Sequence, residues 1–228
     1  MNQRDAAVPV ITVDGPSGAG KGTLAAMVAD RLQFHLLDSG ALYRVVGVTA
    51  AARGMALVEA EAPRIAAMAV SLDIRFAAGA VFVDELDITD AIRNEDGGEA
   101  ASRVAAMPAV RASILDVQFG FRRAPGLVAD GRDMGTVVFP DAQLKIFLDA
   151  SAEERAQRRY KQLKNKGLSV SLPGLLEQIQ QRDARDRGRI VAPLKPAEDA
   201  LVIDSTSMTI EAVFDQVMVW VGERDLAR

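Results

Sequence analysis

VPVITVDGPSGAGKGT, residues 8–23, joins a short apolar run to a glycine-rich segment and then to a helical pattern. The apolar residues between Val8 and Val13 predict a buried strand, and the helical pattern begins at Lys21. The glycines between them let the backbone adopt positive φ angles and approach an anion without an intervening Cβ. Successive backbone N–H groups then point into one concavity at the positive end of the helix dipole. The stretch therefore predicts a phosphate-binding loop.

Two side chains strengthen this interpretation. Lys21 supplies positive charge to the outer phosphates of a nucleotide, and Thr23 offers a hydroxyl to a phosphate oxygen or to Mg²⁺. The general P-loop pattern has Ser or Thr directly after the lysine, whereas here Gly22 comes first. This GxxGxGKGT form resembles the loop of nucleoside monophosphate kinases more than that of GTPases. The alternative is a glycine-rich turn without chemical function, which a lysine at this spacing disfavours.

The composition of the 228-residue chain excludes several classes of protein. The chain has no cysteine, so it forms no disulfide or thiolate metal site, and its single histidine, His35, disfavours histidine catalysis and a His-rich metal site. A formal net charge of −4 is unlike that of a general nucleic-acid binder. We expect no signal peptide and no membrane span, because the first residues are polar and no apolar run is long enough.

Short apolar runs alternate with helical patterns, which predicts an α/β fold with a five-stranded parallel sheet and helices on both faces. The expected strands cover residues 8–13, 35–38, 127–129, 144–149 and 200–204. Residues 55–100 are predicted to form an accessory lobe, with a helix over 59–69, a hairpin that turns at Ala78–Gly79 and a polar loop at 94–99. Two helices that break at Pro108 follow this lobe.

Candidate residues for a second phosphate-bearing ligand lie outside the loop. Ser39 and Arg44 follow the second strand, and the third strand ends in DGRDMG, residues 130–135. Ligands of open α/β sheets gather at such carboxyl ends of strands. Ser102 and Arg111 lie off the apolar stripe of their helices. The structural alternatives are a helix cap for Ser39, an interior helix serine for Ser102, solvated arginines and a tight polar turn at 130–135.

Residues 152–192 form a highly charged arm with two helical patterns and little apolar surface. The second pattern leads into QRDARDRGR, residues 181–189, which contains Arg182 and Arg189. Arginine suits a phosphorylated substrate because its planar guanidinium binds phosphate oxygens bidentately. We expect the arm to close as a lid, since water admitted during phosphoryl transfer would hydrolyse a triphosphate.

These motifs together resemble the bacterial cytidylate kinases, a branch of the nucleoside monophosphate kinases, over nearly the whole chain. They occur in the order GPSGAGKGT, LLDSGALYR, ADGRDMGTVVFPDA, KIFLDAS, RDARDRGR and VAPL. The resemblance implies a P-loop kinase fold whose core comprises residues 1–38, 126–151 and 193–228. It also implies an acceptor-binding region over 39–125, with 55–100 as its insert, and a lid over 152–192.

The same resemblance implies a cytoplasmic monomer that phosphorylates CMP and dCMP, with no nucleic-acid or membrane partner. ATP is the implied phosphate donor, and Mg²⁺ is held mainly by the ATP phosphates, with Thr23 as the candidate protein ligand. The residues implied to bind the ATP phosphates are Gly15, Pro16, Ser17, Gly18, Ala19, Gly20, Lys21, Gly22 and Thr23. Arg158 is assigned to the ATP adenine, with Arg155 and Arg159 as open alternatives.

On the acceptor side, the resemblance implies that Arg44 and Arg132 grip the phosphate and that Ser102 and Arg111 read the cytosine ring. The implied acceptor-binding residues are Ser39, Arg44, Ser102, Arg111, Arg132, Asp133, Arg182, Asp186 and Arg189. The implied catalytic residues are Lys21, Arg132, Arg182 and Arg189.

Two other functions compete with this one. A kinase for AMP, UMP or a shikimate-like acceptor would have the same fold, but Ser102 and Arg111 after a long insert favour cytidylate. A P-loop switch or binding protein is the second. A GTPase should carry a guanine-reading NKxD, whereas residues 165–168 read NKGL.

Overall fold

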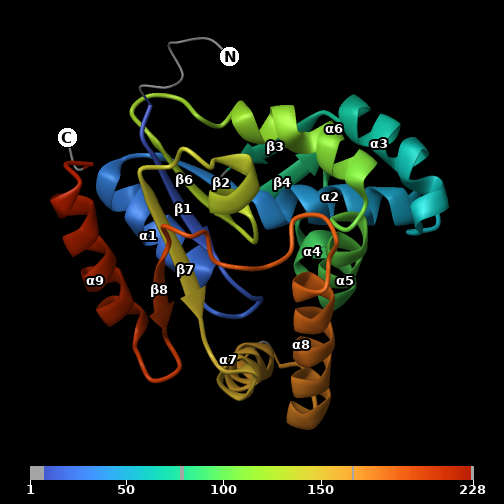
Figure 1. Cartoon of the computed structure of the whole chain (residues 1–228). Helices are drawn as coiled ribbons and strands as arrows, with labels where there is room; N and C mark the ends of the chain where they lie inside the picture. Colours follow the sequence, from blue (N-terminus) through green and yellow to red (C-terminus); the bar gives the residue numbers. More distant parts are fainter. Residues whose placement is uncertain (1–7, 78–79, 166, 227–228) are drawn as a thin grey trace. The chain divides into compact units, whose positions relative to one another are not determined.

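A computed structural model of the protein describes residues 8–77, 80–165 and 167–226 (Figure 1). The chain divides into two compact units. The first unit contains Met1–Asp38 and Gly120–Arg228, and the second contains Ser39–Phe119.

The sheet of the first unit is entirely parallel. Within the described residues it has five strands in the order β2-β6-β1-β7-β8. They are β1 (Val10–Asp14), β2 (His35–Asp38), β6 (Leu127–Gly131), β7 (Leu144–Asp149) and β8 (Leu201–Asp204). Asp14 pairs in register with Gly131 on one side and with Phe147 on the other. The predicted strand set is confirmed, and the phosphate-binding loop leaves the sheet from a central strand.

Helical segments pack on both faces of this sheet, as predicted. Helices α1 (Lys21–Leu32) and α9 (Ile210–Glu223) bury apolar side chains against one face, where Ile11 and Val13 point. The π-helical turn η3 (Met134–Val138) packs on the other face, toward which Thr12 points. Its Gly135 lies so close to this face that a Cβ there would be 2.8 Å from the Thr12 hydroxyl oxygen. Removal of this apolar surface from water is the main favourable contribution to folding.

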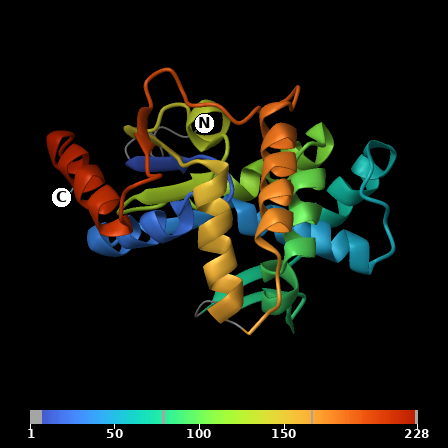
Figure 2. The same cartoon turned by 90° about the horizontal axis from the view of Figure 1, so that it is seen from below.

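Helices α7 (Ala152–Asn165) and α8 (Leu172–Arg187) form the charged arm and lie side by side (Figure 2). Ser151 caps α7 by accepting a hydrogen bond from the N–H of Glu154, and Ser171 caps α8 by accepting one from Gly174. Both predicted helices are therefore present. None of the helices in the described parts of the chain is long and apolar enough to span a membrane.

The second unit is mostly helical. Its helices are α2 (Ser39–Ala52), the 3-10 turn η2 (Glu59–Glu61), α3 (Ala62–Ser71), α4 (Thr89–Arg93), α5 (Glu95–Val104) and α6 (Pro108–Phe119). Its described strands are β3 (Ile74–Ala77), β4 (Ala80–Val83) and β5 (Leu86–Asp87). β3 and β4 pair antiparallel, which confirms the hairpin, although its expected turn, Ala78–Gly79, lies outside the described residues.

The prediction of a loop at residues 94–99 is wrong, because helix α5 begins at Glu95. Asn94 caps α5, because its side-chain oxygen accepts a hydrogen bond of 2.8 Å from the N–H of Gly97. Gly97 serves the close packing of helices, since a Cβ there would lie 2.9 Å from the carbonyl oxygens of Ala91 and Ile92. Glycine usually disfavours a helix, but here it allows α4 and α5 to pack closely.

Candidate active site

The phosphate-binding loop has backbone angles that require glycine. Gly15, Gly18 and Gly20 have φ angles of 148°, 80° and 98°. A Cβ at Gly15 would lie 2.0 Å from the Leu148 carbonyl oxygen, so no other residue fits there. Helix α1 begins immediately afterwards at Lys21, which directs its N-terminal N–H groups toward the loop. The local structure is that of an anion-binding site.

Lys21 is held inside this loop. Its ammonium nitrogen donates a hydrogen bond of 2.8 Å to the Pro16 carbonyl and lies 3.9 Å from the Asp130 carboxylate. Burial lowers the pKa of Lys21 to about 8, and the positive charges of Arg132 and Arg182 act in the same direction. Positive charges gathered this closely repel one another, so a bound polyanion would stabilise all of them.

A carboxylate and three arginines form a buried cluster in the same unit. Arg132 Nε donates to Asp186 at 3.1 Å, Arg189 donates to Asp186 at 2.5 Å, and Arg182 Nε lies 4.0 Å from it. Burial alone would raise the pKa of Asp186, but these arginines hold it below its usual value. Helix α8 thereby approaches the end of β6, and four of the predicted site residues come together.

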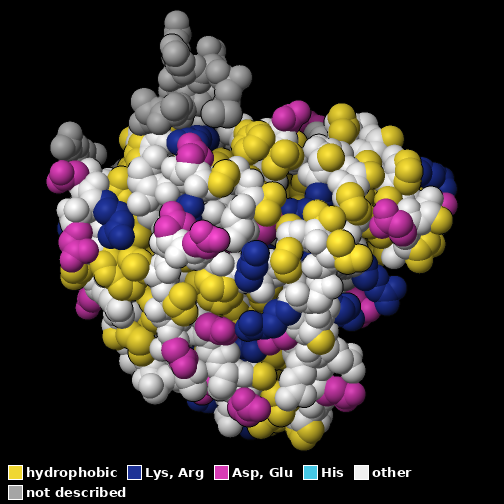
Figure 3. Space-filling view, in the orientation of Figure 1, with side chains coloured by type: hydrophobic (Ala, Val, Ile, Leu, Met, Phe, Trp, Pro, Cys, Tyr) yellow, Lys and Arg dark blue, Asp and Glu magenta, His cyan; other side chains and the backbone are white. Residues whose placement is uncertain are grey.

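Lys and Arg side chains gather at this place on the surface. In Figure 3 they lie just above α7, between the end of β7 and α8, with Asp and Glu side chains next to them. Asp130 lies next to Lys21 and brings a second carboxylate to the loop. Burial raises its pKa to about 6, although Lys21 acts in the opposite direction. Asp130 lies in the candidate segment 130–135, but it was not among the predicted site residues.

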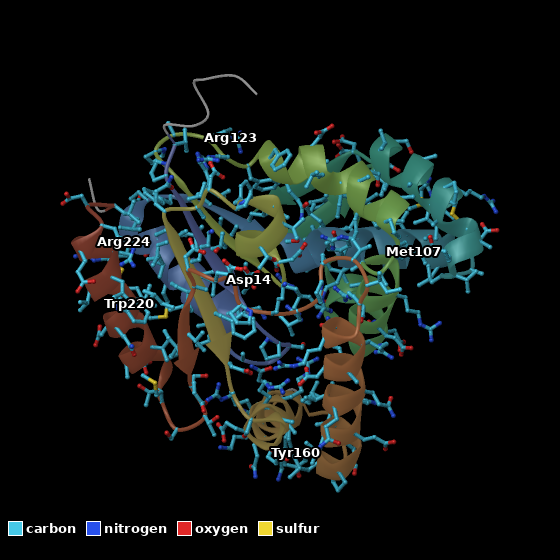
Figure 4. All side chains as sticks on the ribbon, in the orientation of Figure 1. Asp14, Met107, Arg123, Tyr160, Trp220 and Arg224 are labelled. Carbon is cyan, nitrogen blue, oxygen red and sulfur yellow. The ribbon has the colours of Figure 1, made fainter. Side chains whose placement is uncertain are left out.

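Asp14 was not among the predicted site residues, although the structure places it beside residues 130–135. Its carboxylate accepts one hydrogen bond from the N–H of Met134 and one from the N–H of Gly135, both of 2.8 Å. Figure 4 labels Asp14 at the end of β1, next to this turn. The signal that could have identified Asp14 is its position at the end of a buried strand, directly before Gly15. Ligands of open α/β sheets gather at such strand ends, and this rule had identified residues 130–135.

The three arginines considered for adenine lie in different environments. Arg158 donates to the Ser205 carbonyl at 2.6 Å and to the Ala19 carbonyl at 3.4 Å, so it lies beside the loop. Arg159 donates to Gln162 on its own helix. Arg155 is buried and donates to the Ser17 carbonyl and to Asp183. Because its guanidinium group is buried and held by these partners, Arg155 is less suited than Arg158 to pack against an adenine ring.

The second unit contains four of the other predicted acceptor residues, whereas Asp133 is buried in the first unit. Ser39 is the first residue of α2, and its hydroxyl oxygen accepts a hydrogen bond of 2.9 Å from the amide nitrogen of Gln118. Arg44 donates to the carbonyl oxygens of Ile92 and Asn94, at 2.7 and 3.2 Å, where α4 meets α5. Arg44 therefore has structural partners in this unit.

Ser102 and Arg111 are buried polar residues on α5 and α6. Arg111 is 9% exposed and donates a hydrogen bond of 3.1 Å to the hydroxyl oxygen of Tyr43. Tyr43 and Gln118 were not proposed from the sequence. Gln118 lies seven residues after Arg111, on the same side of α6, which was the signal that could have identified it.

No group of three or more His, Asp or Glu side chains in the described ranges is arranged to hold a metal ion. Two oxygen donors nevertheless lie at the loop. Thr23 is exposed in the first turn of α1, and a Cβ at Gly22 would lie 3.3 Å from an Asp130 carboxylate oxygen. Glycine at this position keeps the carboxylate close to the loop backbone. Hydroxyl and carboxylate oxygens are ligands that Mg²⁺ accepts, so this donor set fits the ion.

Comparisons with known proteins agree with one another. A family model described as cytidylate kinase matches residues 11–223. The cytidylate kinase of Stutzerimonas stutzeri is 56% identical over 226 residues, which cover 96% of this chain and 98% of that protein. The cytidylate kinase of Pseudomonas paraeruginosa is 56% identical, with 94% of this chain and 95% of that protein covered. That of Vibrio parahaemolyticus is also 56% identical, with 95% and 96% covered.

Proposed function

The chain belongs to the cytidylate kinase family, and we propose that it transfers the γ-phosphoryl group of ATP in line to CMP and to dCMP, yielding CDP and dCDP. It is a nucleoside monophosphate kinase. The observation that carries the proposal is that Lys21 lies in the loop beside Asp130, while Arg132, Arg182 and Arg189 gather around Asp186 close enough to Lys21 for Arg132 and Arg182 to lower its pKa. Phosphoryl transfer requires positioning and charge neutralisation above all, and this cluster supplies both.

The donor side of the proposed site is the phosphate-binding loop. Its backbone N–H groups hold the ATP phosphates, and Lys21 lies where the transferred group leaves. Thr23 and Asp130, together with the ATP phosphates, would hold Mg²⁺, which neutralises phosphate charge when bound. Arg158 would pack against the adenine, because it lies beside Ala19 of the loop.

The acceptor side is proposed to use the residues that the sequence indicated for a second phosphate-bearing ligand. Arg132, with Arg182 and Arg189, would bind the acceptor phosphate, and Asp186 would accept hydrogen bonds from the pentose hydroxyls. A pocket that relies on the hydroxyl shared by both sugars accepts CMP and dCMP. Ser39, Arg44 and Asp133 are proposed to contact the acceptor as well, while Ser102 and Arg111 would read the cytosine ring. A buried pocket of polar groups rejects other bases, because those bases would leave its donors and acceptors unpaired.

No general base is required in this proposal. The acceptor phosphate is already anionic, so its oxygen can attack without transferring a proton to the protein. The arginines reduce the repulsion between the two phosphates, and the binding sites hold them at reacting distance. The function of α7 and α8 is then to exclude water, which would otherwise accept the phosphoryl group.

Assays with purified protein test the proposal. ADP production from ATP should depend on CMP or dCMP and should be slower with AMP or UMP. Faster turnover of AMP would favour a kinase for another acceptor. Nucleotide binding without ADP production would favour a P-loop binding protein. We also propose a cytoplasmic monomer with no nucleic-acid or membrane partner. The net charge of −4 disfavours a general nucleic-acid partner.

Replacing Arg111 with Met should raise the KM for CMP about tenfold to hundredfold, because a buried hydrogen-bond donor of the base pocket is lost. The KM for ATP should stay within about threefold, since the donor loop belongs to the other unit. Steady-state kinetics with each substrate varied separately measure both values. Arg103→Met on α5 is the matched control, because Arg103 is exposed and pairs with Glu99. Equal losses for CMP and ATP in R111M would remove Arg111 from the base pocket.

A further inference from the structure

We propose that Arg155 and Asp183 form a positioning pair that fixes helix α8 to the phosphate-binding loop, so that ATP binding in the loop orders the arginines of α8. The inference rests on the proposed function, and it concerns two residues outside the implied catalytic and acceptor-binding sets. Neither residue needs to touch a substrate. Both would act through the segments that they hold together.

Arg155 joins three separate segments of the first unit. Its Nε donates to the Ala150 carbonyl at the end of β7, at 2.9 Å. One terminal nitrogen donates to the Ser17 carbonyl of the loop and to Asp183, both at 3.1 Å. The other terminal nitrogen donates to the second carboxylate oxygen of Asp183 at 2.5 Å. A single guanidinium group therefore connects the sheet, the loop and α8.

This arrangement depends on the shape of arginine. The guanidinium group presents its donors in a rigid plane, and here they are used in three directions. The side chains of Arg155 and Asp183 are only 3% and 15% exposed. Loss of either partner leaves a buried charge uncompensated, so the pair strongly favours one relative position of its segments.

The position of α8 matters because of its neighbours on that helix. Arg182 directly precedes Asp183, and Asp186 follows one turn later. Arg182 is close enough to Lys21 to lower its pKa, and Asp186 binds Arg132 and Arg189. A shift of α8 would therefore displace the arginines around the reacting phosphates. Since misplacement by about 1 Å can reduce the rate a hundredfold, a residue that fixes α8 affects turnover without touching substrate.

The opposite side of the pair acts on the loop. The Ser17 carbonyl accepts a hydrogen bond from Arg155. Gly18 packs on the same side chain, because a Cβ at Gly18 would lie 3.4 Å from Arg155 Cβ. A carbonyl held on the outside of the loop helps to keep the neighbouring N–H groups directed inward, toward phosphate. Order in the loop and order in α8 are thus coupled through one side chain.

Asp183→Asn tests the pair, because it removes the charge and keeps the size of the side chain. We expect kcat with CMP to fall about tenfold to hundredfold, while the dissociation constant for ATP stays within about threefold. Arg155→Lys should lower kcat similarly, since an ammonium group cannot reproduce the fork. The double variant should be no worse than the more severe single variant. Additive losses or unchanged kcat in D183N would overturn the proposal.

Arg187→Gln is the matched control. Arg187 also links α8 to β7, through Asp149 at 3.3 Å, but its side chain is half exposed and has no contact with the loop among the hydrogen bonds described. We expect R187Q to keep kcat within about twofold. An equal loss in R187Q would mean that any anchor of α8 is sufficient, which contradicts a specific function for Arg155. If D183N is unfolded at the assay temperature, R155K provides the kinetic test.

Hydrogen exchange separates this inference from the proposed function. In the wild type, ATP with Mg²⁺ should slow amide exchange both in the loop and in α8. In D183N, ATP should still protect the loop and should no longer protect α8. Equal protection of α8 in both proteins would refute the coupling, whatever the acceptor. A wild-type protein that binds ATP but does not phosphorylate CMP would instead refute the proposed function. The comparison of α8 protection between wild type and D183N would still test the coupling.

Discussion

Lys21→Met is expected to lower kcat for phosphate transfer to CMP by about a thousandfold. The ammonium group of Lys21 is buried in the loop, and its nearest carboxylate, Asp130, lies 3.9 Å away. Bound phosphates will raise the pKa of Lys21 above the value of about 8 in the free protein, so the lysine is charged when it is needed. In a buried site, a charge aimed at the transferred group is worth far more than in water.

Rapid-quench measurement of one turnover gives the rate of the chemical step in K21M. The dissociation constant for ATP should rise much less than kcat falls, because the loop N–H groups still bind the phosphates. Lys145→Met is the matched control. Lys145 is also buried in the first unit, but it binds the Pro140 carbonyl and Asp199. K145M should lower the melting temperature and spare kcat. A K21M protein with wild-type turnover would remove Lys21 from the reaction.

The three central strands of the sheet, β6, β1 and β7, were predictable because they are buried on both faces. Such strands appear as short continuous apolar runs, and the turns between them are marked by glycine and proline. The prediction for residues 94–99 was wrong because it relied on the same rule, that Asn and Gly mark the turns between elements. Asn and Gly usually indicate a loop, but here Asn94 caps a helix and Gly97 allows two helices to pack closely. Tertiary packing therefore decided a segment whose local composition indicates a turn.

Residues whose chemistry suits a ligand were easier to propose from the sequence than residues that hold other segments in place. Lys21 and Arg132 lie in motifs whose residue types suit phosphate, so the chemistry itself is the signal. Arg155 and Asp183 lie 28 positions apart on two charged helices. No periodicity relates these two residues, and charge runs on helices are usually solvated. Only the folded chain brings them to the loop.

Asp14→Asn is expected to lower kcat/KM for CMP about a hundredfold while the dissociation constant for ATP changes little. The carboxylate of Asp14 accepts two backbone N–H groups, from Met134 and Gly135. An Asn amide can accept only one of them and would place its NH₂ group against the other. The turn that carries Arg132 and Asp133 should then shift. Thr12→Val is the control, because Thr12 is fully buried on the same strand and faces the same turn.

Stability provides a second, independent readout for Asp14. Burial raises its pKa from 3.8 to about 7, although the two N–H groups act in the opposite direction. The folded state therefore binds more protons than the unfolded state between these pH values, and the free energy of unfolding decreases as pH rises through them. D14N lacks this group, so the wild-type stability minus that of D14N should decrease from about pH 4 to about pH 7. Denaturant titrations across this range measure the difference. A decreasing difference would show that the ionised carboxylate of Asp14 destabilises the fold, in agreement with a positioning function. A pH-independent difference would contradict this interpretation.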